Sequence, residues 1–180
     1  MHSKQRGFTM IELIVVIVIL GILAAVALPR FTNMQRDARI AKLNAARGAV
    51  QAATGMIRGV VLVRAGTVDT AACTDGVTAN NTTTVCTESG TIAIVNGYPA
   101  ATVPGIVNAA GLTTTFFPAG TTVATANTAL APEGYSVAQA GQVMTFRVNG
   151  GTAVANCSFT YTAAAAGGAP VIGAINTAGC

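Results

Sequence analysis

The sequence predicts an α+β fold, in which a long N-terminal helix packs on an antiparallel β-sheet head with a C-terminal disulfide region. Three patterns support this prediction. Residues 8–28 are almost continuously apolar, residues 31–64 carry apolar side chains at steps of three and four, and residues 143–161 alternate around a turn. The first two patterns are typical of helices and the third of a half-buried hairpin.

The apolar run at residues 8–28 is interrupted only by Thr9, Glu12 and Gly21. A helix crosses a bilayer with about 20 residues, so the run predicts a membrane-spanning helix. An ionisable group at bilayer depth costs roughly 2.5–3.5 kcal/mol, so Glu12 should have a partner. Because the run contains no Lys or Arg, we expect that partner on another chain. The alternative is a plain membrane anchor with an incidental Glu12.

The segment before the run is short and basic, with Lys4 and Arg6, and it ends in Gly7. A secretory signal has its cleavage site after the apolar core, whereas here the plausible processing point precedes it. Cleavage after Gly7 would leave an amine at Phe8 and place the acid Glu12 at the fifth mature position. The stretch GFTMIEL, followed by the apolar run, resembles the signature of type IV pilins, and of the type IVa class in particular.

The resemblance implies that residues 1–7 are a leader peptide, removed by a prepilin peptidase between Gly7 and Phe8. It implies N-methylation of the new terminus at Phe8. Glu12 would then pair with the N-terminal amine of a neighbouring subunit, and residues 8–28 would form the core of a filament.

Two positions weaken the predicted helix. Gly21 destabilises a helix relative to Ala, and Pro29 removes one hydrogen bond and predicts a kink. The resemblance implies that the segment between them loses order when a filament assembles. The alternative is that Gly and Pro are simply tolerated in membrane helices.

Residues 29–64 predict an amphipathic helix that continues the apolar one. One face carries mostly small apolar side chains, which we expect to pack on a sheet. This stripe consists of Phe31, Met34, Ala38, Ala41, Ala45, Ala49, Ala52 and Met56. The segment has seven Lys or Arg and one Asp. We expect the basic side chains to lie beside a membrane surface or acidic patches of neighbouring subunits; attraction to nucleic acid is the alternative.

Residues 65–180 predict a globular head. Residues 65–90 have loop composition and residues 113–142 are weakly patterned. The other expected elements are a strand at 91–95 with a turn at Asn96-Gly97, helical turns within 104–112, a strand at 143–148, a turn at 149–151 and a return strand at 153–161. Within the hairpin, Met144, Phe146 and Val148 should share the buried face.

Four cysteines in a chain exported through the membrane indicate disulfides, and they allow three pairings. We predict Cys73–Cys86 and Cys157–Cys180, because each pair is adjacent in sequence and encloses a segment with little apolar content. The pilin resemblance agrees with the second pair. The sequence Asn96-Gly97-Tyr98-Pro99-Ala100, with the Ala38-Arg39 pair and the Gly179-Cys180 end, further resembles the mannose-sensitive haemagglutinin branch of type IV pilins.

No catalytic set accompanies the abundant Ser and Thr, because the only histidine, His2, lies in the leader. We therefore predict no enzyme and no cofactor or metal. A calcium site at Asp75 and Glu88 would have too few ligands.

The sequence thus predicts a structural subunit of an extracellular type IV pilus that serves surface attachment. Its partners would be copies of itself, the prepilin peptidase, the assembly platform and lipid bilayer of the inner membrane before assembly, and an unidentified surface ligand. A pseudopilin of a type II secretion system is the first alternative, and the cysteine pair Cys157 and Cys180 favours a pilin. A membrane-anchored binding protein or enzyme is the second.

Overall fold

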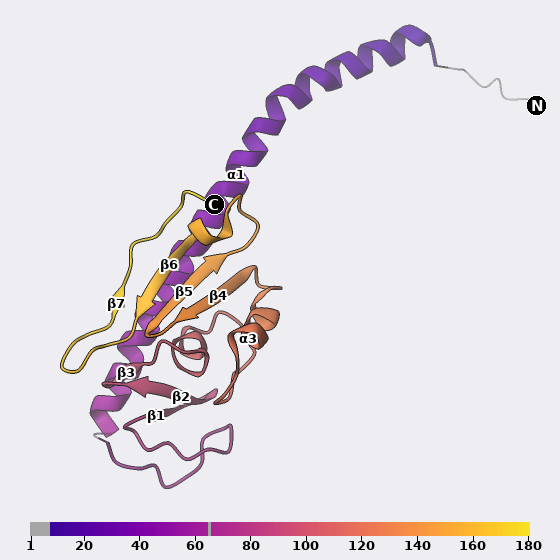
Figure 1. The fold of residues 1–180 in the computed structure, drawn as a ribbon. Coiled ribbons are helices and arrows are strands. Elements are labelled where there is room, and N and C mark those ends of the chain that lie inside the picture. Colours follow the sequence, from indigo (N-terminus) through magenta and orange to yellow (C-terminus); the bar gives the residue numbers. More distant parts are fainter. Residues whose placement is uncertain (1–7, 65) are drawn as a thin grey trace, which may run out of the picture. The chain divides into compact units, whose positions relative to one another are not determined.

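The computed structural model describes residues 8–64 and 66–180, without the side chains of residues 28–30, 32 and 33. The predicted leader, with Gly7, lies outside the described residues. The chain divides into a unit that ends at Ala38 and a second unit, Arg39–Cys180. Together the elements confirm the predicted α+β class, with an N-terminal helix, antiparallel sheets and a C-terminal disulfide (Figure 1).

Helix α1 spans Met10–Arg64, so the long helix predicted from the two patterns is confirmed. Within the first unit, Met10–Ala27 has a mean hydropathy of 3.0, and none of it is buried. By length and composition this segment suffices to cross a membrane. Gly21 and Pro29 both lie inside α1. Loss of order between them stays a prediction.

In the second unit, α1 packs on the sheet through its larger aliphatic side chains. Five positions at steps of three and four are buried. They are Leu43, Ala46, Val50, Ala53 and Ile57. The prediction that the alanine stripe packs on the sheet was wrong, because Ala41, Ala45, Ala52 and Met56 are exposed. Leucine, valine and isoleucine remove more apolar area from water than alanine, so their stripe determines the packed face.

A four-stranded antiparallel sheet lies against this part of α1, as Figure 1 shows. Its strands, in spatial order, are β4 (Tyr135–Ala140), β5 (Val143–Val148), β6 (Ser158–Thr162) and β7 (Val171–Ile172). Strand β5 confirms the predicted strand and its buried face of Met144, Phe146 and Val148. The return strand was predicted too long, because Val154–Asn156 form a short 3-10 helix, η2, before β6.

A second sheet contains β1 (Thr84–Thr87), β2 (Gly90–Val95) and β3 (Tyr98–Pro99). Strand β2 and its turn confirm the prediction, with Asn96 at φ +50° and Gly97 at φ +80°. Both residues are left-handed, as a tight type I′ hairpin requires. Strand β1 was predicted as loop. Its residues Val85 and Cys86 pair with Ile92 and Thr91 of β2 in a tight hairpin, which the loop-like composition of this stretch does not reveal.

Three helical elements complete the head. The predicted turns correspond to η1 (Val103–Val107), one turn of π-helix, and α2 (Asn108–Ala110), which ends at Gly111 in the left-handed region. Helix α3 (Val123–Leu130) was not predicted; the Thr122 hydroxyl caps it by accepting from the Thr125 N–H. Helix α3 packs beside β4 through Ala126 and Leu130.

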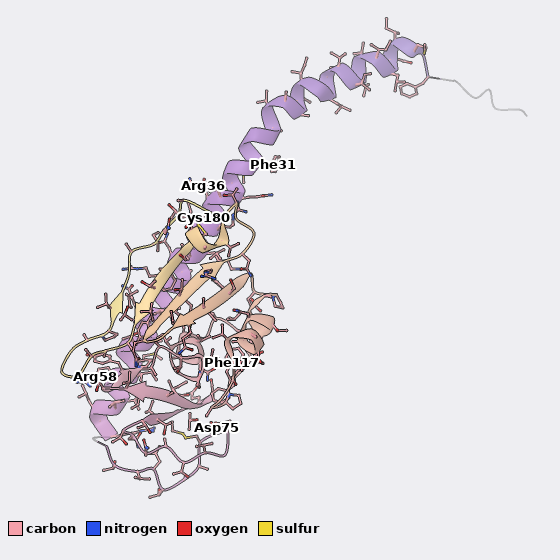
Figure 2. All side chains as sticks on the ribbon, viewed as in Figure 1. Phe31, Arg36, Arg58, Asp75, Phe117 and Cys180 are labelled. Atoms are coloured by element: carbon pink, nitrogen blue, oxygen red, sulfur yellow. A yellow bond between two sulfur atoms is a disulfide. The ribbon has the colours of Figure 1, made fainter. Side chains whose placement is uncertain are left out.

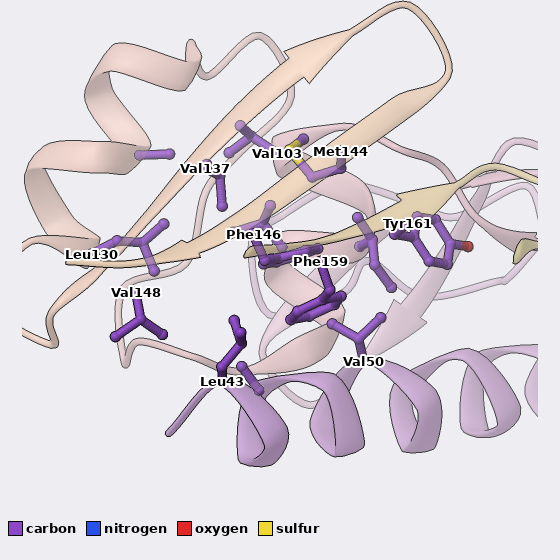
Figure 3. Close-up of a cluster of buried hydrophobic side chains, with 14 of the residues drawn as sticks. Leu43, Val50, Val103, Leu130, Val137, Met144, Phe146, Val148, Phe159 and Tyr161 are labelled. Carbon is purple, nitrogen blue, oxygen red and sulfur yellow. The ribbon is translucent and has the colours of Figure 1, made fainter. Parts of the chain in front are cut away.

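The core lies between α1 and the four-stranded sheet (Figure 3). The rings of Phe146 and Phe159 stack with centroids 5.1 Å apart, above Leu43 and Val50 of α1. Tyr161 is fully buried, and its hydroxyl donates a hydrogen bond of 2.6 Å to the Pro99 carbonyl. Burial raises the pKa of the Tyr161 phenol well above its usual range, so it stays a neutral donor. This bond joins the two sheets.

Both disulfides join the pairs that the sequence predicts. Cys157 and Cys180 have Cα atoms 4.7 Å apart, and the two side chains are buried. Cys73 and Cys86 have Cα atoms 5.6 Å apart and connect the loop after α1 to strand β1. The first bridge fastens the chain end to the core, and the second braces a surface segment.

Candidate functional site

The N-terminal end of α1 contains a capping box formed by Thr9 and Glu12. The Glu12 carboxylate accepts hydrogen bonds from the backbone N–H and the hydroxyl of Thr9, each 2.8 Å long. In return, the Thr9 hydroxyl accepts from the Glu12 N–H at 3.3 Å. These bonds satisfy N–H groups that a helix start leaves unpaired. Glu12 therefore has a partner within its own chain, contrary to the expectation that its partner lies only on another one.

The spacing Thr-x-x-Glu is a sequence signal for this capping box, and it was missed because the acid lies within an apolar run. Phe8 immediately precedes the capping residue and is 83% exposed. The predicted processing position and the acid are therefore both accessible at the same helix end.

Among the residues that the structure describes, nothing in the first unit covers the apolar side chains of Met10–Ala27. All of Met10–Ala27 is unburied, and the exposed side chains include Ile11, Leu13, Val15 and Leu20. Apolar area of this extent is unfavourable in water. The segment therefore requires lipid or other protein chains around it.

The basic side chains of α1 in the second unit bind the head of their own chain. Arg39 donates to the carbonyl of Cys180, which lies beside α1 in Figure 2. Lys42 donates to the carbonyl of Glu133, and its ammonium lies 4.6 Å from the centre of the Tyr135 ring. For Arg39 and Lys42, these contacts correct the expectation that the basic side chains face a membrane or neighbouring subunits, whereas Arg36 is exposed.

Two further contacts follow the same pattern. Arg47 donates to the Gly173 carbonyl at 3.1 Å, and Arg58 lies 4.8 Å from the centre of the Tyr98 ring. At the end of α1, Arg64 forms an ion pair of 3.0 Å with Asp69. Charge-assisted bonds and cation–π contacts thus fasten the head along α1.

Asp75, one of the two acidic side chains considered for calcium, is engaged in hydrogen bonds within the head. Asp75 accepts from the Thr91 N–H at 3.0 Å and from the Thr91 hydroxyl at 2.6 Å. Burial acts to raise the pKa of Asp75, but these hydrogen bonds outweigh it and hold the pKa below its usual range. Asp69 lies near Cys73 and Cys86, but both thiols are used in the disulfide. Neither arrangement supplies the several oxygen ligands that calcium needs.

The face of α1 that carries Ala41, Ala45 and Ala52 remains open in the second unit. Further along the helix, a shallow groove on the surface is lined mainly by Gly55, Met56, Gly59, Val60 and Val63. Small side chains let another helix approach closely. The open face is therefore suited to helix packing.

Comparison with known proteins places the similarity in one part of the chain. Residues 2–28 match the family model described as the prokaryotic N-terminal methylation motif. The chain is 48% identical over 50 residues to the type IV narrow pilus major component PilA5 of Thermus thermophilus, covering 28% of this chain and 43% of that protein.

Two other relatives agree. The type IV major fimbrial protein FimA of Dichelobacter nodosus is 40% identical over 53 residues, 29% of this chain and 34% of FimA. The type IV major pilin protein PilE1 of Neisseria gonorrhoeae is 50% identical over 42 residues, 23% of this chain and 26% of PilE1. The chain thus matches less than half the length of these relatives, and no solved structure matches it.

Proposed function

We propose that this chain is a structural subunit of an extracellular type IV pilus that serves surface attachment. The observation that carries the proposal is the uncovered apolar segment Met10–Ala27. This segment begins at a capped, accessible helix start, and it lies within the stretch that matches a methylation motif. Relatives described as major pilus components support it. The role is structural rather than enzymatic, as in those relatives.

Processing follows the order implied by the motif. A prepilin peptidase removes residues 1–7 by cutting between Gly7 and Phe8, and Phe8 is then N-methylated. Before assembly, residues 8–28 span the inner membrane, where the assembly platform receives the subunit. Intact-mass analysis of purified filaments tests this step. A mass that retains His2–Gly7 would contradict it.

In the filament, residues 8–28 form the core together with copies of the same chain, and the amphipathic part, residues 29–64, carries the head, residues 65–180. Glu12 exchanges its bonds to Thr9 for the amine of Phe8 on a neighbouring subunit. The stretch between Gly21 and Pro29 loses order as the subunits pack. Packing of the core removes apolar surface from water, and the contact of Glu12 with the amine compensates a charge.

A shearing experiment decides between the pilin and a pseudopilin. A pilin should appear as abundant filaments in the fraction sheared from the bacterial surface, whereas a pseudopilin should remain with the cells in short periplasmic filaments. The Cys157–Cys180 bridge favours the pilin. The likeness at Asn96–Ala100 and Gly179-Cys180 favours the mannose-sensitive haemagglutinin branch within the pilins.

A further inference from the structure

A shallow groove on the second unit runs along the last turns of α1. Gly55 and Gly59 lie one helical turn apart in it, and a Cβ atom added to either would meet nothing within 4 Å apart from the helix's own backbone. Beside them, Met56 and Val63 are 67% and 86% exposed. The groove is lined by Gly55, Met56, Gly59, Val60, Val63 and Arg64. This apolar hollow is left open by the part of the chain that the structure describes.

The two glycines are not required by any contact within the described residues. Glycine destabilises the interior of a helix relative to alanine, because it has more backbone freedom to lose. No described neighbour excludes a side chain at Gly55 or Gly59. Small residues one turn apart do let the backbone of a second helix approach closely. The shape of the groove therefore suits a helix from outside the chain.

The first unit presents side chains that fit such a groove. Phe31 and Met34 are 63% and 65% exposed, and their spacing of three residues places both on one face of α1. They are large and apolar, whereas Gly55 and Gly59 offer space between apolar side chains. Packing the two surfaces together would remove apolar area of both from water. Every copy of the chain therefore carries both halves of one contact.

A pair of charges sets the direction of this contact. Asp37 is exposed, and it forms no ion pair among the described side chains. Arg64 lies at the end of the groove; its side chain is 33% exposed and binds Asp69 through one of its five N–H donors' nitrogens. Asp37 lies six residues beyond Phe31, and Arg64 lies five residues beyond Gly59. If Phe31 packs over the glycines, parallel helices bring Asp37 level with Arg64, whereas antiparallel helices separate them.

We propose that the groove binds α1 of a second copy in parallel, with Phe31 and Met34 against the two glycines and Asp37 beside Arg64. The two halves of the contact lie on different parts of the chain, so the contact is heterologous. Heterologous contacts extend into open filaments when the rotation between copies does not close a ring. The inference deepens the proposed function by naming one contact between subunits, and it rests on that function.

The apolar segment Met10–Ala27 of a second copy is the other helix that could occupy the groove, since it is also uncovered. Its charged side chain, Glu12, lies near the start of the segment and accepts from Thr9. If Glu12 lay level with Arg64 in parallel helices, the apolar residues after it would lie beyond the groove. The order of apolar side chains and acid in the groove's partner therefore favours the stretch from Phe31 to Asp37.

Photo-cross-linking in sheared filaments tests the contact. The full mature chain carries p-benzoylphenylalanine in place of Phe31, which keeps an aromatic ring at that position. After illumination and digestion, mass spectrometry should join residue 31 of one copy to residues 55–63 of another. The monomeric chain in detergent is the control and should not form this cross-link. Cross-links to Met10–Ala27 instead of 55–63, no cross-link between copies, or the same cross-link within single chains would overturn the proposal.

Gly59→Leu is a second test, which also decides if the chain with the photo-reactive residue does not assemble. Leucine favours a helix over glycine, so the chain in detergent should unfold at the same or a higher urea concentration. The added side chain fills the groove, so filament yield should fall by about tenfold or more. Ala124→Leu adds the same side chain at an exposed position of α3 and should assemble normally. Normal filaments from Gly59→Leu, or an equal loss from Ala124→Leu, would overturn the proposal.

Substitution of Asp37 tests the direction of the contact. Asp37→Lys would place a second cation beside Arg64 and should lower filament yield by about two- to fivefold, the range expected for an exposed charge pair. Asp37→Glu keeps the charge and should assemble normally. Equal yields from these two variants would overturn the parallel register. Wild-type chains that form no filaments would contradict the pilin proposal, and this contact with it, whereas normal filaments with cross-links elsewhere would contradict the contact alone.

Discussion

The Glu12 carboxylate accepts two hydrogen bonds from Thr9, one from its backbone N–H and one from its hydroxyl. The same carboxylate is the group proposed to bind the amine of Phe8 on a neighbouring subunit. Glu12 would therefore have two uses, first as the cap of its own helix and then as an intermolecular partner. Since a carboxylate has two oxygens with several acceptor sites, part of the cap can persist after the exchange.

Two substitutions separate these uses. Glu12→Gln keeps an oxygen that can accept from Thr9 but removes the charge, so filament yield in the sheared fraction should fall at least tenfold. Thr9→Ala removes the hydroxyl of the cap, which costs about 0.5–2 kcal/mol of helix stability, and filament yield should stay within about twofold. If Thr9→Ala abolished filaments as fully as Glu12→Gln, the cap rather than the charge would be the assembly requirement.

The second prediction compares the two disulfides by replacing each pair with alanine. Loss of Cys157–Cys180 should lower the free energy of unfolding by about 3–5 kcal/mol. It removes a loop constraint, leaves space in the core and frees the Cys180 carbonyl that binds Arg39. Loss of Cys73–Cys86 should cost about 3 kcal/mol at most in the chain-entropy model, because this bond braces a surface segment.

Chemical unfolding of the two double variants in detergent measures the difference. The wild-type chain with both bridges intact is the reference, and the double replacement leaves no single thiol that could form a wrong bridge. A larger loss for the Cys73/Cys86 variant would contradict the importance assigned to the C-terminal bridge.

Much of the fold was predictable from periodicity and turn chemistry. Strand β5 follows from alternation around Phe146, and the hairpin turn follows from Asn96-Gly97, which tolerates positive φ. Helix α3 and strand β4 could not be predicted, because their mixture of small apolar and polar side chains is compatible with either structure. Tertiary contacts with the core at Leu130 and Val137 decide their conformation.

The contacts of the candidate site could not be predicted from the sequence, although its acid could be singled out. Glu12 is conspicuous because it lies in an apolar run, and the spacing from Thr9 contains the capping signal. The targets of Arg39 and Lys42 leave no sequence signal, because they are backbone carbonyls, which every residue has. The packed face of α1 was misjudged because alanine is apolar on either face, whereas Leu43 and Val50 gain more from burial.

The third prediction concerns pH. Hydrogen bonds from Thr91 lower the pKa of Asp75 in the folded chain, so the folded state favours the carboxylate more than the unfolded state does. The resulting stabilisation is present above the unfolded value of about 3.9 and is lost as the pH falls through the folded value. Asp75→Asn should therefore show a smaller loss of stability than the wild type between pH 6 and pH 2.5, measured by urea unfolding.

Thr91→Val is the matched variant for that experiment. It keeps the shape of a buried side chain and removes the hydroxyl that donates to Asp75, but leaves the backbone N–H in place. Its pH dependence should lie between those of the wild type and Asp75→Asn. The same pH dependence in all three proteins would show that these bonds contribute nothing to acid stability.

The last prediction tests which face of α1 packs on the head and which remains open for other subunits. Ala45 and Ala46 are adjacent, but Ala45 is exposed whereas Ala46 is 1% exposed and lies in the core. Ala46→Leu adds three carbons to a filled core and should lower the free energy of unfolding by about 1–3 kcal/mol. Ala45→Leu should change it by less than about 0.5 kcal/mol, as expected for a surface substitution.

Ala45→Leu, the substitution with little effect on stability, should be the one that lowers filament yield. Ala45→Leu leaves the head intact but adds bulk where neighbouring helices approach through small side chains, so sheared filaments should decrease while the detergent-solubilised chain unfolds normally. Ala45→Ser, which stays small, is the control and should assemble. A stable Ala46→Leu chain together with a destabilised Ala45→Leu chain would mean that the alanine stripe faces the sheet after all. Normal filaments from Ala45→Leu would remove this face from the subunit contacts.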